Sequence, residues 1–585
     1  MSLDIARLVA FSGISATELQ ISVASSNISN ADTKGYTQKT ANQVTNVTGG
    51  VGTGVSITGI SSNVDKLLLK SLIGANSELG AADTTNNYLT QLQQLFGSAS
   101  TSGTSTTGTS LANSLASLES ALSSLASSPS SVSLQSAVVS ALDDFASQLR
   151  STSSGVQTLR ANADKDIASS VQSANDDLQQ IADLNVEIRK MAASGQSTAD
   201  LEDERNAALQ DLSSYMNVSY YAASNGDLQV YTSSGRALVD SSAHTLSYTA
   251  SANVSAASSY ASGGFSGIMV DGVDVTSQIT SGKIGSLVTL RDETLPAAQT
   301  QLDQLASQLK SSLNAITNGA SAVPPPTALT GSASVSSTTA LSASGTVRIA
   351  VADQSGNLVS YEDLDLSSYA TVGDLVTALN GISGVSASID SSGHLSISAT
   401  SSSNGIAIND MTSAVGGSGF SDYFGMNDLV TGTSAANFAV NSSILSGAAG
   451  LPTGTLDGSA TLTTGSQVLT AGSATVIDAL VDKLTGSTSF ASAGGLSATT
   501  GSFADYAAAI VANVASKASQ ASTAYTAKST AQSSYASSLS SQSGVNLDEE
   551  TARLSSLQNK YAAASQLISV VNSMFSSLLT AVQST

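Results

Sequence analysis

The C-terminal segment carries the most regular hydrophobic pattern in the sequence. Apolar residues alternate three and four positions apart over four heptads: Leu554, Leu557, Tyr561, Ala564, Ile568, Val571, Phe575, Leu578 and Val582. The other faces of this segment hold Ser, Ala, Gln and Asn, with few charges. A narrow stripe of this kind cannot be buried by one helix alone, so the segment requires a partner helix with the same period.

A second stripe of the same type lies at the opposite end of the chain. Ile14, Ile21 and Ile28 repeat every seven residues, and Phe11 and Ser25 fill the alternate positions. Because the periods match, we predict that residues near 3–30 pair with residues near 547–583 and bring the two termini together. We also expect the C-terminal stripe to contact neighbouring subunits.

Between these ends the pattern changes from helical to strand-like and back. Leucines three and four apart over residues 111–125 predict a helix, and alternation around Val347, Ile349 and Val351 predicts a strand before a turn at 355–357. The sequence therefore predicts an α+β multidomain protein with paired N- and C-terminal coiled-coil helices, a helical-bundle shell and β-rich outer domains inserted in the middle. The predicted parts are a terminal coiled-coil layer (1–40 and 545–585), a helical shell (41–215, 285–320 and 472–544), a small β subdomain (216–284) and an outer β-rich domain (321–471).

Composition limits the partners and chemistry of the chain. Its 585 residues include no cysteine, and 43 acidic against 21 basic residues give a formal net charge of −22. This charge repels nucleic acid and anionic lipid, and the lack of cysteine excludes disulfide and thiolate sites. The N-terminal residues lack a basic region followed by an apolar core, and no segment approaches about 18 uninterrupted apolar residues. We expect no nucleic-acid partner, no membrane insertion and no cleaved Sec-type signal.

Candidate catalytic and ligand-binding motifs are incomplete. His244 and His394 lie in Ser-rich, strand-like surroundings that are typical of surface residues. Residues 281–285 lack the Ser or Thr of a phosphate loop, and residues 50–59 lack the strand and acid of a dinucleotide site. Residues 353–357 lack the downstream carboxylate of a calcium loop. We predict no enzymatic activity, no cofactor and no metal site.

A short motif follows the first predicted helix. Residues 25–38 read SSNISNADTKGYTQ and match the pattern N-I-A-N-x-x-T-x-G-Y, with Ser29 in place of Ala. The matching positions are Asn27, Ile28, Asn30, Thr33, Gly35 and Tyr36. This motif resembles the N-terminal signature of the flagellar axial proteins, the family of rod, hook and hook-associated proteins. By itself it also fits an ordinary helix stop, and the C-terminal stripe strengthens the resemblance.

Three further regions resemble the same family. Residues 543–579 are similar to its C-terminal signature in the hook-associated form, and residues 199–239 and 282–309 are similar to members found between hook and filament. The acidic run at 200–205 within this stretch is predicted to be a solvated helix face.

The resemblance implies a structural role. Paired termini would form the innermost layer of a tube, helices the next shell, and β domains would project outward. A short homo-oligomeric ring would contact the hook protein and the next hook-associated protein, and a dedicated export chaperone would bind the C-terminal helix. Export would use the flagellar type III channel, which places the protein outside the cell. In this interpretation Asn30, Asp32 and Thr33 cap the helix end, Gly35 allows a positive φ and Tyr36 anchors a hinge between layers.

Two alternatives stay open at this point. One is a different axial protein, of hook or filament type, and residues 199–239 weaken it. The other is a secreted adhesin-like protein whose Ser/Thr-rich middle binds a ligand. An adhesin requires an anchor, a translocation barrel or a Sec signal at one end, whereas an axial protein requires paired heptads at both ends.

Overall fold

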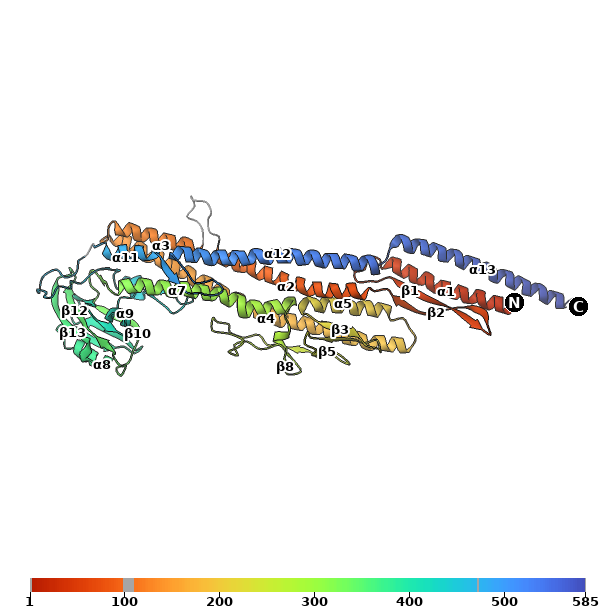
Figure 1. Ribbon diagram of the computed structural model, residues 1–585, viewed down its shortest axis with the longest axis horizontal. Coiled ribbons are helices and arrows are strands. Elements are labelled where there is room, and N and C mark those ends of the chain that lie inside the picture. Colours follow the sequence, from red (N-terminus) through yellow and green to blue (C-terminus); the bar gives the residue numbers. More distant parts are fainter. Residues whose placement is uncertain (1–2, 98–109, 471–472, 584–585) are drawn as a thin grey trace. The chain divides into compact units, whose positions relative to one another are not determined.

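The structure is a computed structural model that describes residues 3–97, 110–470 and 473–583. These residues form two compact units (Figure 1). Unit 1 consists of Met1–Tyr88, Ala161–Asp292 and Ser519–Thr585, and unit 2 of Leu89–Arg160 and Glu293–Ala518. Parts of the predicted domain ranges, at 1–2, 98–109, 471–472 and 584–585, lie outside the described residues. The mixture of long helices with several small sheets confirms the α+β multidomain class, and the predicted domain boundaries stay predictions.

The two terminal helices of unit 1 pack against each other. They are α1 (Leu3–Ser29) and α13 (Leu547–Gln583), and the start of α1 lies at the same end of this pair as the end of α13 (Figure 1). The guanidinium carbon of Arg7 lies 6.0 Å from the centre of the Phe575 ring, whereas Gln38, just beyond α1, contacts Glu550 in the first turn of α13. The helices therefore run in opposite directions, and their contact confirms the predicted pairing of the termini.

The alternate positions of the α1 stripe differ from the prediction. Phe11 is 63% exposed and Ser25 is also exposed, whereas Ala10, Thr17 and Ala24 are buried. Together with the predicted isoleucines, these buried positions alternate four and three along α1. The stripe therefore uses small side chains one position earlier than expected, and small side chains let the two helix backbones approach closely.

A long hairpin covers a second face of α1. Strands β1 (Lys39–Thr48) and β2 (Val51–Ser62) pair antiparallel and pack on this helix. The backbone N–H of Val55 donates to Ser12 Oγ at 3.1 Å. Gly54 has φ +130, and a Cβ there would lie 2.1 Å from Ser12 Oγ, so this approach requires glycine. Helix α1 thus packs against both α13 and the hairpin.

The shell of unit 1 is helical. It takes residues from α2 (Lys66–Phe96), α4 (Val132–Ala193), α5 (Ala199–Tyr215), α6 (Gly282–Thr289) and α12 (Phe503–Ser543), of which α2, α4 and α12 also contribute to unit 2. Helices α2 and α5 approach closely at Gly80, where a Cβ would lie 2.3 Å from the carbonyl oxygen of Ser214. The shell therefore depends on small residues at its closest contacts.

Two small sheets lie on α4 in unit 1. The first contains β3 (Ser219–Ala222), β4 (Leu228–Tyr231) and β5 (Ala237–Val239), and the second contains β6 (Leu246–Ser247), β7 (Met269–Val270) and β8 (Val273–Asp274). The Asn185 side chain exchanges two hydrogen bonds of 2.9 Å with the backbone of Leu228. Asn175 bonds the Leu246 backbone in the same way, at 2.8 and 2.7 Å. One asparagine of α4 thus anchors each sheet.

The helices of unit 2 include α3 (Leu111–Ala126), α7 (Leu295–Thr317) and α11 (Thr475–Thr485). All five leucines predicted to form the inner face of α3 are buried, which confirms that helix: Leu111, Leu115, Leu118, Leu122 and Leu125. A short turn of π-helix, Leu290–Thr294, comes directly before α7.

The β-rich part of unit 2 contains two three-stranded antiparallel sheets. One has the order β10 (Ala328–Ser334), β15 (His394–Ala399), β14 (Val385–Ile389), and the other β13 (Leu358–Asp365), β12 (Thr346–Asp353), β16 (Asn404–Asn409). They enclose a core with α8 (Val372–Leu379) and α9 (Phe420–Phe424). The predicted turn at 355–357 joins β12 to β13, with Gly356 at φ +83. Shorter elements are β9 (Ser321–Ala322), β11 (Ala343–Ser344), β17 (Ala414–Val415), β18 (Val430–Thr431), β19 (Ala439–Val440), α10 (Ser442–Leu445), β20 (Pro452–Gly454), β21 (Thr488–Phe490) and β22 (Thr499–Gly501).

Candidate functional site: the junction between the terminal helices and the shell

Asn27 closes the loop that follows α1. Its side chain is fully buried; the Nδ2 group donates to the Lys39 carbonyl and the Oδ1 atom accepts from the Lys39 backbone N–H, both at 3.0 Å. The same Oδ1 atom accepts a 2.9 Å hydrogen bond from the Tyr36 hydroxyl. A carboxamide supplies the donor and the acceptor that this arrangement needs. Asn27 therefore fixes where the chain leaves α1 and where β1 begins.

The other residues of the predicted motif lie around this loop. Asn30 donates to the Ser26 carbonyl at 3.0 Å, and the Thr33 hydroxyl donates to Asn30 Oδ1 at 3.3 Å. Gly35 has φ +83, a conformation that side chains disfavour. Ile28 is half-buried at the end of α1, and Asp32 is exposed. Local hydrogen bonds thus hold this turn together, apart from the longer contacts of Asn27 and Tyr36.

A buried ion pair attaches the loop to α5. The Lys39 ammonium pairs with the Asp203 carboxylate, and both side chains are almost fully buried. Lys39 Nζ also donates to the Ala199 carbonyl at 3.0 Å, while Thr37 donates to Asp203 from its N–H at 2.9 Å and from its hydroxyl at 2.7 Å. The prediction of a solvated face for residues 200–205 is therefore wrong at Asp203, since a buried ammonium partner offsets the cost of burying its charge.

Arg205, in the same run, is also buried. Its Nη1 atom donates to Asn185 Oδ1 and to the Gly226 carbonyl, both at 2.8 Å. Burial lowers the pKa of Arg205, although Glu202 and Asp227 oppose this effect. Only Asp200 and Glu204 of the run are well exposed.

Tyr36 interacts with the Lys39 ammonium and with three carboxylates of the junction. Its ring centre is 4.7 Å from Lys39 Nζ, a cation–π distance. Burial raises the pKa of Tyr36, and the negative charges of Asp200, Asp203 and Glu550 raise it further. The phenol therefore stays protonated and serves as a hydrogen-bond donor.

The C-terminal signature reaches the same loop. The backbone N–H of Gln38 donates to the Ser543 carbonyl at 2.8 Å, and Gln38 Nε2 donates to Glu550 Oε1 at 2.6 Å. Asn546 Oδ1 accepts from the backbone N–H groups of Asp548 and Glu549, at 3.1 and 3.3 Å, and so caps the start of α13. The two signatures, more than 500 residues apart, thus form one structure at the point where both helices leave the shell.

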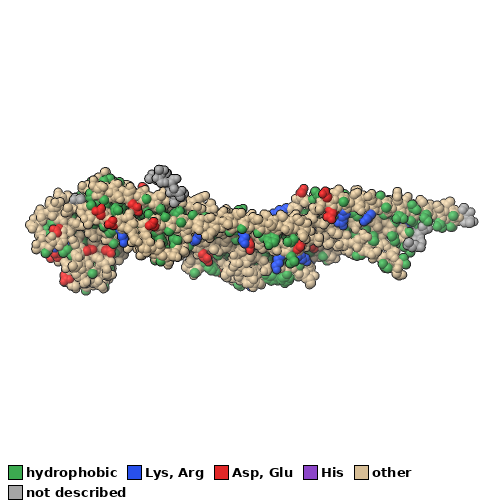
Figure 2. Space-filling model, turned by 45° about the horizontal axis from the view of Figure 1, so that its top comes forward, with side chains coloured by type: hydrophobic (Ala, Val, Ile, Leu, Met, Phe, Trp, Pro, Cys, Tyr) green, Lys and Arg blue, Asp and Glu red, His purple; other side chains and the backbone are tan. Residues whose placement is uncertain are grey.

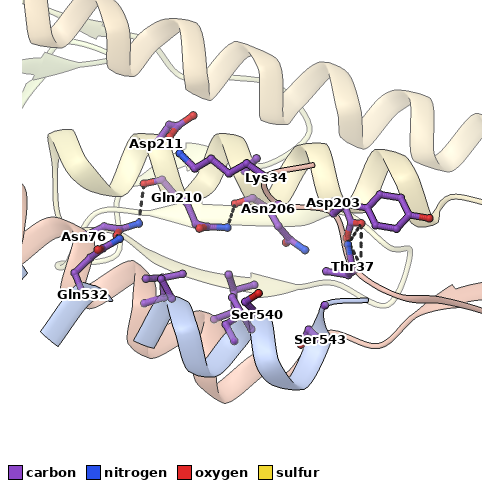
Figure 3. Close-up of a pocket in the computed structure, with 18 of the residues that line it drawn as sticks. Lys34, Thr37, Asn76, Asp203, Asn206, Gln210, Asp211, Gln532, Ser540 and Ser543 are labelled. Atoms are coloured by element: carbon purple, nitrogen blue, oxygen red, sulfur yellow. Dashed lines mark hydrogen bonds between the residues drawn. The ribbon is translucent and has the colours of Figure 1, made fainter. Parts of the chain in front are cut away.

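A cavity of about 800 Å³ lies beside this junction in unit 1 (Figure 3). Its walls come from the loop after α1 and from α2, α5 and α12. The Asn76 amide donates to the Gln210 carbonyl at 3.3 Å and accepts from Gln532 at 3.1 Å, which links three helices across it. No histidine lies among its lining residues, and in the described part of the chain no group of three or more His, Asp or Glu could hold a metal ion. The cavity has the character of a packing or docking space.

The predicted stripe residues lie on the α1–α13 contact to different degrees. Leu557 and Val571 are buried, and a larger group is half-buried: Ile14, Ile21, Leu554, Ile568 and Phe575. Tyr561 and Leu578 are exposed. The structure thus brings most of the stripe against α1 within one chain.

Sequence reasoning missed several junction residues. The contacts that join Lys39 to Asp203 and Gln38 to Glu550 could not be predicted, because the partners lie far apart along the chain. One local signal was present: Lys39 follows the Gly35–Tyr36 pair at the start of an otherwise uncharged strand.

Segments of the chain match known protein families. Residues 76–322 match the family described as Flagellar hook-associated protein FlgK helical domain. Residues 8–37 match Flagella basal body rod protein, and residues 536–581 match Flagellar basal body rod FlgEFG protein C-terminal. Residues 346–401 match Flagellin hook IN motif. The first three matches cover most of both terminal helices, much of the helical shell and part of the junction, whose residues Gln38 and Lys39 lie outside the matched ranges.

Individual proteins are also similar to the chain. Flagellar hook-associated protein 1 of Salmonella typhimurium (strain LT2) is 24% identical over 314 residues, which are 52% of this chain and 55% of that protein. The protein of the same name from Escherichia coli (strain K12) is 22% identical over 313 residues, with the same shares. The chain thus spans about half the length of the curated relatives it matches. The solved structure of the flagellar hook junction protein FlgK from Burkholderia pseudomallei has a TM-score of 0.47 and 17% identity, over 80% of this chain and 98% of that chain.

Proposed function

Since the chain is a flagellar axial protein of the hook-associated type, we propose that it is a structural subunit of the bacterial flagellum that joins the hook to the filament. Two rod-family termini flank a helical domain of the hook-associated kind, which supports this assignment. The chain would then act by geometry and contact, not by chemistry on a substrate.

One observation carries the proposal: the N- and C-terminal signatures meet in a single hydrogen-bonded junction. Asn27 fixes the exit from α1, and Gln38 joins that exit to Ser543 and Glu550 at the entry to α13. A subunit that supplies two paired helices to an inner layer needs both helices to leave its outer body at one place. The buried Lys39–Asp203 pair then attaches this place to the shell.

The proposal includes partners and location. The subunits would form a short homo-oligomeric ring between the hook protein and the next hook-associated protein, outside the cell after export. A dedicated export chaperone would bind the C-terminal helix, whose apolar side chains are largely exposed in the single chain. Nucleic acid and membrane insertion are not part of this role, and neither is enzymatic activity.

A hook or filament subunit is the nearest alternative. The match of residues 346–401 to a flagellin hook motif favours it, because that motif is named for those proteins. The longer match of residues 76–322 favours the hook-associated type. The adhesin alternative agrees less well with the structure, because the junction between the termini would have no function in an adhesin.

Deletion of the encoding gene and labelling of the protein test the proposal. We expect deletion cells to carry hooks without filaments and to release filament subunits into the medium. Gold-labelled antibody should mark a single site at the base of isolated filaments from complemented cells. Labelling along the whole filament would refute the junction role and favour the filament alternative.

A further inference from the structure

His244 holds a carboxylate against each of its two ring nitrogens. Its Nδ1 atom lies 2.8 Å from Asp271 Oδ2, and its Nε2 atom lies 3.2 Å from Asp240 Oδ2. The Nε2 atom is buried, and its contact with Asp240 is an ion pair without hydrogen-bond geometry. A neutral imidazole carries one N–H group and can donate to only one of the two carboxylates, whereas the imidazolium carries two. The arrangement therefore favours the charged ring.

Arg236 completes the charge balance around His244. Its Nη2 atom lies 3.4 Å from Asp271 Oδ2 and donates to the Val270 carbonyl at 3.2 Å. With the ring protonated, two cations face two carboxylates. Loss of the proton leaves one negative charge in excess and directs a nitrogen lone pair at a carboxylate, which is repulsive. Tyr231 of β4 interacts with the other carboxylate of the group, and a hydrogen bond with a neighbouring phenol raises the pKa of Tyr231, so this residue stays neutral.

The surroundings of the ring keep all of these groups in their charged forms. Burial of the ring opposes its charge, but contacts with Asp240 and Asp271 outweigh burial and raise the pKa of His244 above its ordinary value of 6.5. Burial also opposes the charge of Asp240, whereas hydrogen bonds from the backbone of Ser242 and Ser241 and from His244 lower the pKa of that carboxyl. The four charged side chains, Arg236, Asp240, His244 and Asp271, are called the His244 clamp below.

The His244 clamp joins the two small sheets of unit 1. Asp240 comes directly after β5 of the first sheet, and His244 lies two residues before β6 of the second. Asp271 lies in the turn between β7 and β8, with φ +48, and Gly272 follows with φ +76. Positive φ at both central residues defines a type I′ turn, for which Asp–Gly is a favoured pair. The ring therefore connects the end of the first sheet to a tight turn of the second.

The second sheet has few other contacts that could hold this turn. Each of its strands, β6, β7 and β8, contains two residues, and residues 248–268 between β6 and β7 form no helix or strand. The sheet buries Leu246 and Val270, and Asn175 anchors it at β6. Very short strands are marginal by themselves, so side-chain contacts at the turn contribute a large share of its order.

We propose that His244 is a pH-sensitive clamp, which fastens the β7–β8 turn to the first sheet while the ring is charged and releases the turn when the ring loses its proton. The folded chain holds this proton more tightly than the unfolded chain does. The stabilisation is therefore complete below about pH 6 and is lost as pH rises through the raised pKa of His244. Solvent reaches the ring, which is 26% exposed, and Asp271, which is 49% exposed, so the effect is a local release and not unfolding of unit 1. The clamp does not depend on the proposed function.

Hydrogen exchange of the full-length protein tests the clamp. Peptides from residues 246–276 are compared between wild type and His244→Gln at one pH, where the intrinsic exchange rates are the same. We expect the variant to exchange about fivefold faster at about pH 5.5 and within about twofold of wild type at about pH 8.5, where both side chains are neutral. His394→Gln is the control, because His394 lies in β15 of unit 2, and should leave these peptides unchanged. An equal ratio of variant to wild-type rates at the two pH values would overturn the proposal.

Nuclear magnetic resonance of the rings measures the charge itself, because the chain contains only two histidines. Protein labelled with carbon-13 in histidine gives two titrating signals, and the spectrum of His394→Gln assigns them. We expect the His244 midpoint to lie above 6.5 in the wild type and to fall by about half a unit or more in Asp271→Asn. This variant keeps the turn, since Asn–Gly also suits type I′. A wild-type midpoint at or below 6.5, or the same midpoint in Asp271→Asn, would overturn the proposal.

Discussion

The side-chain amide of Gln38 donates a 2.6 Å hydrogen bond to the carboxylate of Glu550, which is only 1% exposed and lies 512 positions further along the chain. Arg553 approaches the same carboxylate oxygen at 3.5 Å. A carboxylate in the first turn of a helix also interacts favourably with the helix dipole. The start of α13 is therefore specified by the segment that ends α1, and the two helices enter the terminal layer from one point.

Asn27→Ala should destabilise unit 1 strongly. The substitution removes three hydrogen bonds and leaves the buried backbone groups of Lys39 without their partner. We expect the free energy of unfolding to fall by about 2–4 kcal/mol, measured by denaturant titration. Asn30→Ala is the control: its hydrogen bonds are local and partly solvated, so a loss below about 1 kcal/mol is expected. Equal losses would show that Asn27 is not the closing residue.

Asp203→Ala should cost more than removal of both partners of the ion pair. It leaves the Lys39 ammonium buried without its carboxylate, at an expected cost of about 3–5 kcal/mol. The double variant Lys39→Met/Asp203→Leu should be closer to wild type, since no unpaired charge remains. Asp200→Ala is the matched control, because its side chain is 77% exposed and 3.6 Å from Lys39, and should change stability by less than about 0.5 kcal/mol. A double variant as unstable as Asp203→Ala would contradict this account.

Asp177→Asn should stabilise the protein at high pH only. Burial, together with the negative charges of Asp211 and Asp176, raises the pKa of Asp177 to about 7. The folded chain holds the Asp177 proton more tightly than the unfolded chain does. The contribution of the protonated carboxyl to the free energy of unfolding is therefore complete below about pH 4 and is lost as pH rises towards about 7. Because the group is only partly buried, we expect a gain of about 1 kcal/mol at pH 8.

Thermal unfolding at several pH values checks the Asp177 prediction. At pH 3 the wild type and Asp177→Asn should unfold alike, because the carboxyl is then mostly protonated in both the folded and the unfolded state. Asp183→Asn, at an exposed position of the same helix whose charge is not among those that raise this pKa, provides the control. A difference between wild type and Asp177→Asn that does not change from pH 3 to pH 8 would rule out titration as its cause.

The pairing of the termini could be predicted from the sequence because a heptad repeat is a local property that demands a partner. The buried positions between the isoleucines of α1 could not be predicted, since the face of α1 that meets α13 depends on the hairpin. With the hairpin beside Gly13 and Gln20, the small residues Ala10 and Ala24 are buried, whereas Phe11 is left exposed.

The burial of charged residues was the other feature that local sequence patterns could not predict. Asp203 lies in a run that fits a solvated helix, and its burial is made favourable by Lys39, 164 positions away, and by two hydrogen bonds from Thr37. The order of residues in the motif at 25–38 indicated a special helix end. It did not indicate that Asn27 bonds the backbone of Lys39, because that contact requires the loop to fold back on itself.

Val571→Asp should separate α13 from α1. Val571 is 5% exposed within the α1–α13 contact, so a carboxylate there is desolvated without a partner, at a cost of about 3 kcal/mol. We expect trypsin to cleave faster at Arg7 and Lys560, which lie within the two helices, while cleavage in unit 2 stays unchanged. Ser576→Asp adds the same charge on the solvent side of α13 and should be cleaved like the wild type. Mass spectrometry of timed digests locates each cut. Identical digests of wild type and Val571→Asp would mean that the two helices are not paired in the free chain, and assembly would then have to bring them together.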